Sequence, residues 1–571
     1  MPVRLPSPRA PRPRARPAAV RAGALLAAGL LAPPRARLLA QPVLGAGEDA
    51  TIPAPGQARA RGIGTITAAG STFGTGALRS LGAPFTTDSL GPTQFPRLQA
   101  ARDTLRAITG NSGLALSLGS VQVGAYAQTI SVPVILEVGI ARRFALGVNV
   151  PFNRTRVTVG PSVNAGGASA ATAKGNFGFN PANASLSGST AASAALARNG
   201  QVQTNLAQAD TALRNAGFAA LADSVRRFAA GLASVYGTGS AAGANAVPLL
   251  GSDAQTAVVQ QLRSLAARAR ATGGVAIDTT VVPYAATERI GINGYRRALA
   301  DSSFGLANYD SLGATTGRRE SVGDVEVTGM FNWLDTFGGP SDLRGATRAR
   351  VAPQGRRIRS TVVAGFRLGT GRNAIPGVLF DVPPATGANA ILLRSITDVA
   401  FGRRISVSGA ARLTAPLADT RTLRLRAAID SGYVPLYRER QVERQLGREV
   451  QLELNPRYAA GDAFAVWGQA LVRTRQADRY TGTYTATSAE TGGAPVTFDA
   501  ASAGAGTAQR EGRFGLGVAY STLAAFSRGR ARLPIEVSYL HAVSAFGSGA
   551  TTPRLTADVL SLRVYAALRG R

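Results

Sequence analysis

The chain has 571 residues, no cysteine, one histidine and a formal net charge of +31. The lack of cysteine excludes disulfide scaffolds, thiolate metal sites and a cysteine nucleophile, and a single histidine fits poorly with a His-rich metal site. The positive charge does not indicate nucleic-acid binding, because the arginines are scattered along the chain without forming a basic block. We therefore expect no metal, no cofactor and no nucleic-acid partner.

Residues 1–40 have the features of an export signal. They contain eight arginines and no acidic residue, and an apolar run, Ala22–Ala32, precedes Leu38-Leu39-Ala40. This run is too short to span a bilayer as a helix, as expected for the central part of a signal peptide. A disordered basic tail is the alternative. No later segment is apolar over the length that a transmembrane helix needs.

The next segment, 41–113, is rich in Gly, Pro and Thr and has only weak periodicity around 62–73. We interpret it as an N-terminal extension, or as a plug that folds back into a larger unit. One short helix is predicted within it, at Gln99–Ile108.

From residue 114 onwards the apolar residues recur at every second position, which places them on one face of a strand. The run REVQLEL, which begins at Arg448, shows this alternation most clearly. Comparable segments are 114–127, 129–140, 144–152, 322–333, 358–371, 390–401, 404–415, 448–458, 463–475, 513–523, 532–544 and 554–568. They predict about twelve strands, each long enough to cross a bilayer when tilted.

The connections alternate in length. Tight turns are predicted at 141–143, 402–404 and 459–462, and long connections at 160–320, 372–389, 416–447 and 476–512. Outer-membrane barrels have short periplasmic turns and long external loops, so the alternation favours an all-β fold, an antiparallel transmembrane β-barrel over 114–568. The connection 335–357 does not fit, because it is long where a short turn is expected.

The connection 160–320 is too long for a plain loop. Two apolar stripes at helical spacing lie within it, one from Leu221 to Leu232 and one from Val258 to Ala269. They predict a helical hairpin inserted between two strands, either outside the cell or folded into the barrel mouth.

Several of these segments resemble a known family. The motifs are LEVGIARRFALGVNVPF from Leu136, VGDVEV from Val322, GFRLGTG from Gly365 and LELNPRY from Leu452. They are similar to bacterial outer-membrane barrel transporters, including those linked to meta-pathway phenol degradation. The resemblance implies a channel in the outer membrane of a Gram-negative-type bacterium that passes small molecules, aromatic or apolar ones among them. Many such barrels end in an aromatic residue, whereas this chain ends in LRGR.

Strand parity also predicts which charged side chains face the lumen. They are Glu137, Asp324, Glu326, Arg359, Arg367, Arg394, Asp398, Arg412, Glu449, Glu453, Arg457, Arg473, Arg475 and Arg563. Six of the arginines, on four of the predicted strands, would make one side of the lumen positive, which predicts weak anion selectivity.

Passive transport is therefore the expected function, with outer-membrane lipid and a small solute as partners, the barrel-assembly machinery for insertion, and a monomeric state. One alternative is a surface-exposed structural or adhesion protein that uses the barrel as an anchor. The other is an outer-membrane hydrolase. Parity argues against an enzyme, because His541 shares a face with apolar residues while Ser538 and Ser544 lie on the other.

Overall fold

The computed structural model describes residues 49–74, 76–164, 175–239, 241–306, 317–337, 356–373, 376, 383, 385–402, 404–426, 432–487 and 493–567. The predicted signal peptide lies outside these residues.

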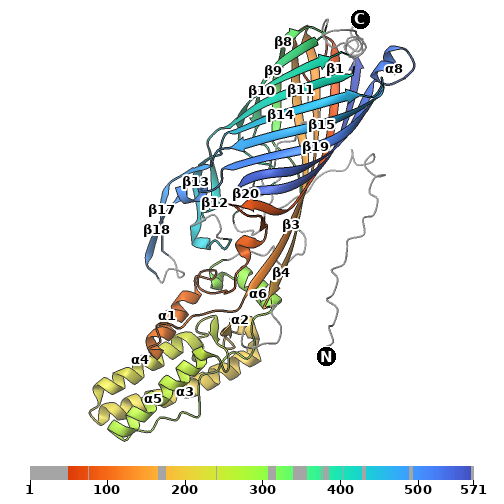
Figure 1. Cartoon of the computed structure of the whole chain (residues 1–571). Helices are drawn as coiled ribbons and strands as arrows, with labels where there is room; N and C mark the ends of the chain where they lie inside the picture. The colour runs from red at the N-terminus through yellow and green to blue at the C-terminus, as the bar shows by residue number, and fades with distance from the viewer. Residues whose placement is uncertain are drawn as a thin grey trace, which may run out of the picture.

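A closed antiparallel β-barrel forms the larger part of the molecule (Figure 1). Its strands are β1 (Gln57–Gly74), β3 (Val121–Ala141), β4 (Phe144–Val163), β8 (Val325–Asp335), β9 (Arg356–Leu368), β10 (Ala390–Phe401), β11 (Ile405–Pro416), β14 (Glu449–Ala459), β15 (Phe464–Arg475), β19 (Gln509–Ser521) and β20 (Ile535–Ala567). Neighbours in the sheet follow the order β1-β20-β19-β15-β14-β11-β10-β9-β8-β4-β3, and β3 pairs with β1 to close the ring. The predicted all-β barrel fold is confirmed.

Strand β20 crosses the barrel wall twice. Its first half pairs with β19 over 536–548, and its second half pairs with β1 over 549–567. The backbone N–H of Leu555 donates to the Ser544 hydroxyl at 3.0 Å, and His541 Nδ1 lies 2.8 Å from an Asp558 oxygen. In one extended strand, positions 541 and 558 would be roughly 55 Å apart, so the chain must reverse between the halves. The wall of the barrel therefore consists of twelve strand segments among the described residues, an even number, as is usual for bacterial outer-membrane barrels.

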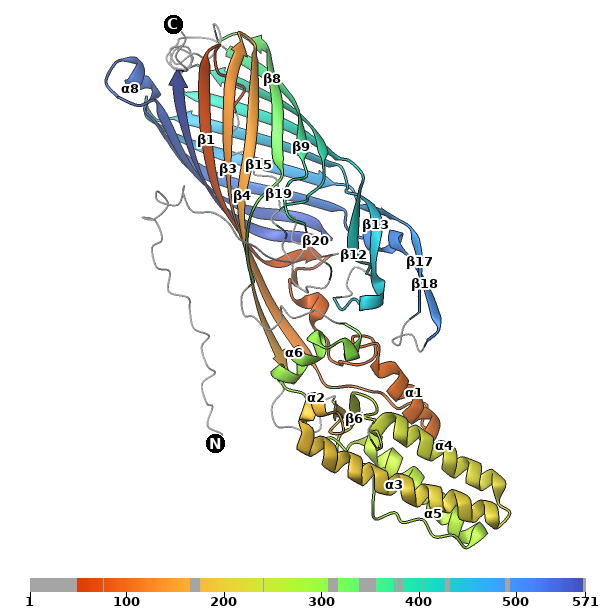
Figure 2. The ribbon, with the colours of Figure 1, turned by 180° about the vertical axis from the view of Figure 1, so that it is seen from behind.

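Strand β1 is the main difference from the predicted domain limits. It lies between β20 and β3, with Ile66 opposite both Asp558 and Ile130 (Figure 2). The barrel thus begins near residue 57 and not at 114. The two predicted strands 114–127 and 129–140 correspond to a single strand, β3. Residues 114–120 precede it and have no regular structure. The count stays at twelve because one predicted strand is lost and β1 is gained.

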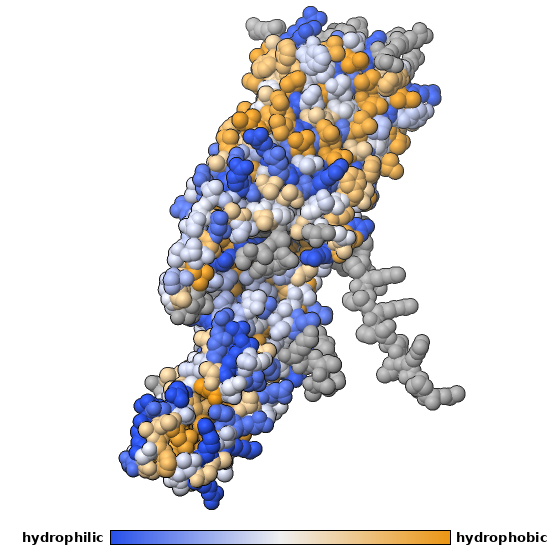
Figure 3. Space-filling view, turned by 60° about the vertical axis from the view of Figure 1, so that its left-hand side comes forward, coloured by the Kyte–Doolittle hydropathy of each residue, from blue (hydrophilic) through white to orange (hydrophobic). Residues whose placement is uncertain are grey.

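The outer face of the barrel carries the large apolar side chains. On β14, Leu452 and Leu454 are half exposed, while Glu453 between them is 4% exposed. The same alternation leaves apolar residues exposed on the other strands, for example Val134, Phe144, Phe331, Leu393, Phe514 and Leu562. The surface view, which shows one face of the molecule, has an apolar zone over the barrel (Figure 3). Hydrocarbon is the solvent that such a surface requires.

The two ends of the barrel differ as the connections predict. The turns between β3 and β4, β10 and β11, and β14 and β15 are short, and they lie at the end where β20 finishes and β1 begins. The helix α8 (Leu523–Ser527) connects β19 to β20 at this same end. The hairpins β12 (Asp419–Arg424) with β13 (Glu439–Gln445) and β17 (Thr483–Thr487) with β18 (Pro495–Asp499) lie at the opposite end.

A helical unit extends from the end with the long connections, where β3 and β4 continue beyond the other strands (Figure 1). It contains α3 (Ser189–Asn215), α4 (Ala219–Tyr236) and α5 (Asp253–Gly273), and α1 (Leu98–Thr109) from a different connection packs against α4 and α5. The short elements are α2 (Ala184–Ser187), β5 (Phe177–Phe179), β6 (Ala246–Pro248), α6 (Ile292–Ala300) and η2 (Ser302–Phe304). No helix among the described residues is long and apolar enough to cross a membrane.

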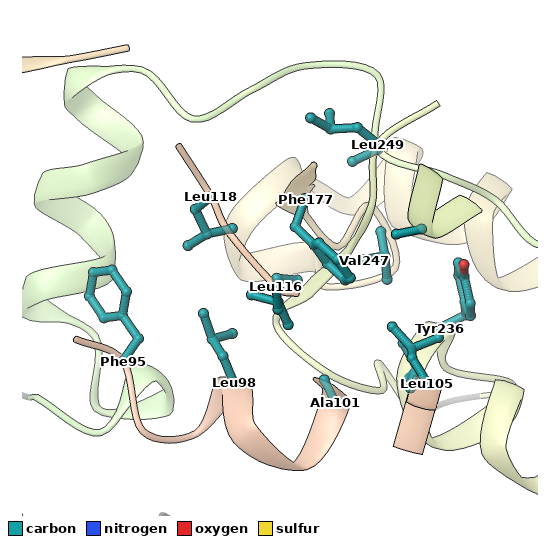
Figure 4. Close-up of a cluster of buried hydrophobic side chains, with 14 of the residues drawn as sticks. Phe95, Leu98, Ala101, Leu105, Leu116, Leu118, Phe177, Tyr236, Val247 and Leu249 are labelled. Carbon is teal, nitrogen blue, oxygen red and sulfur yellow. The ribbon is translucent and has the colours of Figure 1, made fainter. Parts of the chain in front are cut away.

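The helical unit has its own hydrophobic core (Figure 4). Leu98, Leu105, Leu116, Phe177 and Val247 are each at most 3% exposed, and they come from α1, the segment before β3, β5 and β6. The predicted helix at 99–108 and the two predicted apolar stripes correspond to α1, α4 and α5. The unit is therefore larger than the predicted hairpin, because α3 and α1 are part of it.

Helix α3 was not predicted, for a physical reason. Its buried positions repeat at spacings of three and four residues: Ala192, Ala195, Asn199, Val202, Leu206, Ala209 and Leu213. Four of the seven are Ala or Asn, so the heptad pattern has little hydrophobic contrast. Two hydrogen bonds offset the cost of burying Asn199. Its side chain donates to the Tyr236 carbonyl at 2.8 Å and accepts from the Tyr284 amide at 2.9 Å.

Candidate functional site

The interior of the barrel contains the charged residues that parity assigns to it. Nine of the fourteen are buried: Glu137, Asp324, Glu326, Arg359, Arg367, Glu453, Arg473, Arg475 and Arg563. The other five are partly buried: Arg394, Asp398, Arg412, Glu449 and Arg457. All but Asp324, which precedes β8, lie in strands, and most of the fourteen contact one another or other buried polar residues.

Ion pairs join the inner faces of neighbouring strands. Glu326 of β8 accepts from Arg367 of β9 at 2.8 Å and from Arg394 of β10 at 2.6 Å. Further around the wall, Arg412 of β11 lies 3.1 Å from Glu453 of β14. Glu453 also accepts from Asn455 at 2.9 Å and from Gln469 at 2.8 Å. These contacts fix the side chains in a network along the polar wall.

The expected positive side of the lumen is not what the structure shows, because each of its six arginines has a carboxylate partner. The pairs are Arg359–Asp335 at 3.1 Å, Arg367–Glu326 at 2.8 Å, Arg412–Glu453 at 3.1 Å, Arg457–Glu536 at 3.2 Å, Arg473–Glu511 at 3.4 Å and Arg475–Asp478. Burying a charge without a partner is costly, so neighbouring elements supply the compensating carboxylates.

The segment 49–56, which we name the plug, lies inside the barrel at the end where the turns are short. The Ala50 N–H donates to Asp398 at 2.8 Å, and the Ala50 carbonyl accepts from the Thr361 hydroxyl at 2.6 Å. Ala50 and Ile52 are buried against inner-face residues: Ala145, Met330, Val363, Ile396 and Ala410. The backbone N–H of Gly56 donates to the carbonyl of Gly139 at 3.1 Å, immediately before β1 begins.

Asp49, the first described residue, joins the plug to the wall through charge. Its carboxylate bonds to the Arg563 guanidinium, and Arg59 Nη1 lies 3.5 Å from its other oxygen. Arg59 also binds Thr51, through the hydroxyl at 2.6 Å and the carbonyl at 3.0 Å, and it pairs with Glu137. The plug is therefore held by both backbone and ionic contacts.

A cavity of about 440 Å³ lies beside the plug. Its lining includes charged side chains, namely Asp49, Arg359, Asp398, Arg457, Glu536 and Arg563. It also includes apolar residues: Ala465, Trp467 and Ala519, together with Leu523 and Ala524 from α8. The cavity is thus amphipathic, with charged and apolar side chains in one lining.

Three of these apolar residues, Ala465, Trp467 and Ala519, belong to an apolar strip along the inner wall. It contains Ile63, Ala465, Trp467, Ala519, Leu540, Ala542, Ala557 and Val559, from β1, β15, β19 and both halves of β20. These strands are consecutive around the barrel. The inner wall therefore carries an apolar strip on strands that also contribute charged residues to the ion pairs.

At the other end of the barrel, residues after β9 and before β10 bind Asp324. The Asp324 carboxylate accepts from the Gly371 amide at 3.0 Å, from the Thr386 hydroxyl at 2.7 Å and from the Gly387 amide at 3.2 Å. Arg421 of β12 donates to the Gly387 carbonyl at 2.6 Å. A small cavity of about 40 Å³ lies beside these residues, lined in part by Arg367, Arg473 and Arg475.

Sequence reasoning missed several lumen residues. Asp49, Arg59 and Arg61 belong to the segment interpreted as an extension, although the run ARARGIGTIT alternates with period two. Glu511 was missed because β19 begins four residues before the predicted strand. Glu511 stands two residues before Arg513 and therefore shares its strand face, and this spacing was the signal that could have found it.

His541 lies on the outer face. Its imidazole is 2.8 Å from the Asp558 carboxylate, which also accepts from the Tyr539 hydroxyl at 2.7 Å. Ser544 is on the inner face and bonds to Glu511 at 3.2 Å. Within this hairpin the structure therefore brings no serine to the histidine, and it offers no Ser–His dyad of a hydrolase.

No protein-family model matches the sequence, and the search of curated proteins found no match. Among solved structures, an outer membrane channel from Pseudomonas putida F1 is similar at a TM-score of 0.36 and 6% identity, covering 90% of this chain and 96% of that one. A FadL homologue from Pseudomonas aeruginosa has a TM-score of 0.24 and 11% identity, with 90% of each chain covered. The transport unit of the autotransporter AIDA-I from Escherichia coli has a TM-score of 0.27 and 7% identity, covering 89% of this chain and 90% of that one. Similarities this weak assign the chain to no family, and the chain's own residues show it to be a closed β-barrel of the outer-membrane type.

Proposed function

We propose that this protein is an outer-membrane channel for the passive passage of small molecules, aromatic or apolar ones among them. The observation that carries the proposal is the inner surface of the barrel, where an apolar strip lies beside buried ion pairs. A barrel that served only as an anchor would need no continuous apolar wall beside a cavity of about 440 Å³. Nothing in this function requires catalysis.

The proposed orientation follows from the two ends. The short turns, together with the start of β1 and the end of β20, lie at one end of the barrel, and the helical unit lies at the other. Short turns are periplasmic in outer-membrane barrels. The plug and the larger cavity would then face the periplasm, and the helical unit would be outside the cell.

In the proposed channel, the described conformation is the closed one. The plug occupies part of the lumen at the proposed periplasmic end. Passage would therefore require the plug to move. Because the strands close into a ring within one chain, a monomer suffices, and we propose that it is inserted by the barrel-assembly machinery.

Conductance in planar bilayers tests the proposal. The full-length protein should show brief openings, and Ala50→Pro should lengthen them, because proline removes the N–H that donates to Asp398. Ala182→Pro in the helical unit is the matched control, since its N–H also donates to a side chain, Asn180. Liposomes containing the protein should also release a small aromatic alcohol faster than empty liposomes.

A second candidate function, anchoring of the helical unit at the cell surface, is favoured by the filled lumen. In that case neither the native chain nor Ala50→Pro would conduct, and deletion of 189–273 would remove adhesion while leaving the barrel folded. Conductance that depends on the plug would exclude a purely structural barrel.

A further inference from the structure

The contact between Asp49 and its two arginines is an anion site occupied by the protein itself. Arg59 and Arg563 belong to adjacent strands of the wall, β1 and β20, and each is 5% exposed. The carboxylate between them comes from the plug, which is not a strand of the wall. The wall thus supplies a fixed pair of guanidinium groups, and the plug supplies the carboxylate.

The charge balance of the cavity depends on this carboxylate. The lining includes four arginines (Arg359, Arg404, Arg457 and Arg563) and four carboxylates (Asp49, Asp398, Asp462 and Glu536). If the plug moves away with Asp49, the lining retains one excess positive charge. Because a buried charge without compensation is costly, withdrawal of the plug favours entry of an anion.

The apolar residues of the same cavity determine what else that anion should contain. Trp467 and Ala519 are 6% and 4% exposed and present apolar surface to the cavity. A volume of about 440 Å³ falls in the range of pockets that hold small organic ligands. The ligand that fits the charged and the apolar residues of this lining has one carboxylate and a small apolar or aromatic body.

We propose that the cavity binds small organic carboxylates, and that the ligand's carboxylate replaces Asp49 between Arg59 and Arg563 and so releases the plug. The inference rests on the proposed channel function, to which it adds a substrate class and a mode of opening. Guanidinium groups bind carboxylates through charge-assisted hydrogen bonds, so the incoming group can make the same type of contact as the group it displaces.

A binding measurement tests the site independently of conduction. The chain has two tryptophans; Trp333 is half exposed on the outer face and Trp467 lines the cavity. In Trp333→Phe, all tryptophan fluorescence comes from Trp467. Titration of this full-length variant in detergent with benzoate should give a saturable change in emission, whereas benzyl alcohol, which lacks the charge, should bind at least about tenfold more weakly.

Substitutions in the same background identify the two partners. Asp49→Asn should strengthen benzoate binding by about tenfold, because it weakens the internal competitor. Arg563→Gln should abolish the saturable change, and Arg563→Lys should retain part of it. Arg367→Gln is the matched control, because Arg367 is buried in the lumen but does not line this cavity. The shift in gel mobility between heated and unheated samples shows whether each variant has folded.

Each result has a definite meaning. Equal affinity for benzoate and benzyl alcohol, or native affinity in folded Arg563→Gln and Arg563→Lys, would overturn the carboxylate site. Native affinity in Asp49→Asn would overturn the competition with the plug. In bilayers, benzoate should increase the open time of the native channel but not that of Arg563→Gln. A protein that binds benzoate without ever conducting would contradict the channel function instead, and a conducting protein without benzoate binding would contradict only this inference.

Discussion

The barrel and the helical unit bury opposite kinds of side chain. In the barrel, Glu511 and Arg513 are at most 1% exposed while Leu516 is 75% exposed. In the helical unit, Val258 and Leu262 are at most 1% exposed and the arginines of α5 lie on the surface. One chain therefore follows two burial rules, because hydrocarbon surrounds the barrel and water surrounds the helices.

The largest expected effect comes from breaking a buried charge group of the barrel. Glu511→Ala would leave Arg473 and Arg513 without a carboxylate that both contact. We expect a loss of about 3–5 kcal/mol in the free energy of unfolding, measured by urea titration in detergent. Glu320→Ala, at a pair that is about two-fifths exposed, is the control and should change little. An equal effect of both would mean that the lumen is as well solvated as the surface.

The second prediction makes the same substitution in both regions. Leu262→Ala in α5 removes a side chain that is 1% exposed and should destabilise the helical unit by about 2–4 kcal/mol. Leu452→Ala, at 54% exposure on β14, should have less than half of that effect. Loss of helical circular dichroism on heating reports the first change, and heat-induced gel mobility reports the second.

The third prediction reverses the exposed positions. Leu452→Arg should cost the barrel about 2–4 kcal/mol and reduce its insertion, because the guanidinium would face hydrocarbon. Leu250→Arg, at 68% exposure in the helical unit, should be tolerated. The amount of folded protein in vesicles measures both. Normal insertion of Leu452→Arg would mean that this face of β14 does not contact lipid.

The smallest effect concerns accessibility without any change in stability. Trypsin added to intact cells should cut near Arg270, which is exposed in the last turn of α5, and should spare the arginines of the lumen. Cleavage only after lysis would reverse the proposed orientation.

The sequence predicts the parts of the barrel that have high hydrophobic contrast. Strand β14 is evident because leucines alternate with glutamates. Strand β1 is not, because its outward residues include Ala60, Gly62 and Gly64, which contrast little with the polar residues between them. For the same reason α3, whose heptad positions are largely alanine and asparagine, is invisible to a search for apolar stripes.

The sequence predicts which face of its strand a charged residue occupies, but not which residue it contacts. Parity alone indicates that Arg563 points inward. Its contact with Asp49 joins residues more than five hundred positions apart, and it depends on a plug that has no periodicity. The order of strands around the ring decides which charges meet, and a single sequence does not contain that order.

The closure of the ring has a consequence for biogenesis. Strand β1 pairs with the second half of β20, so the barrel cannot close until the last strand has been exported. By contrast, α3, α4 and α5 are close in sequence, and local contacts of this kind form rapidly. In the proposed orientation, a helical unit that folded early in the periplasm would have to cross the membrane as a folded body. Secretion would then need to keep 189–273 unfolded until the membrane has been crossed.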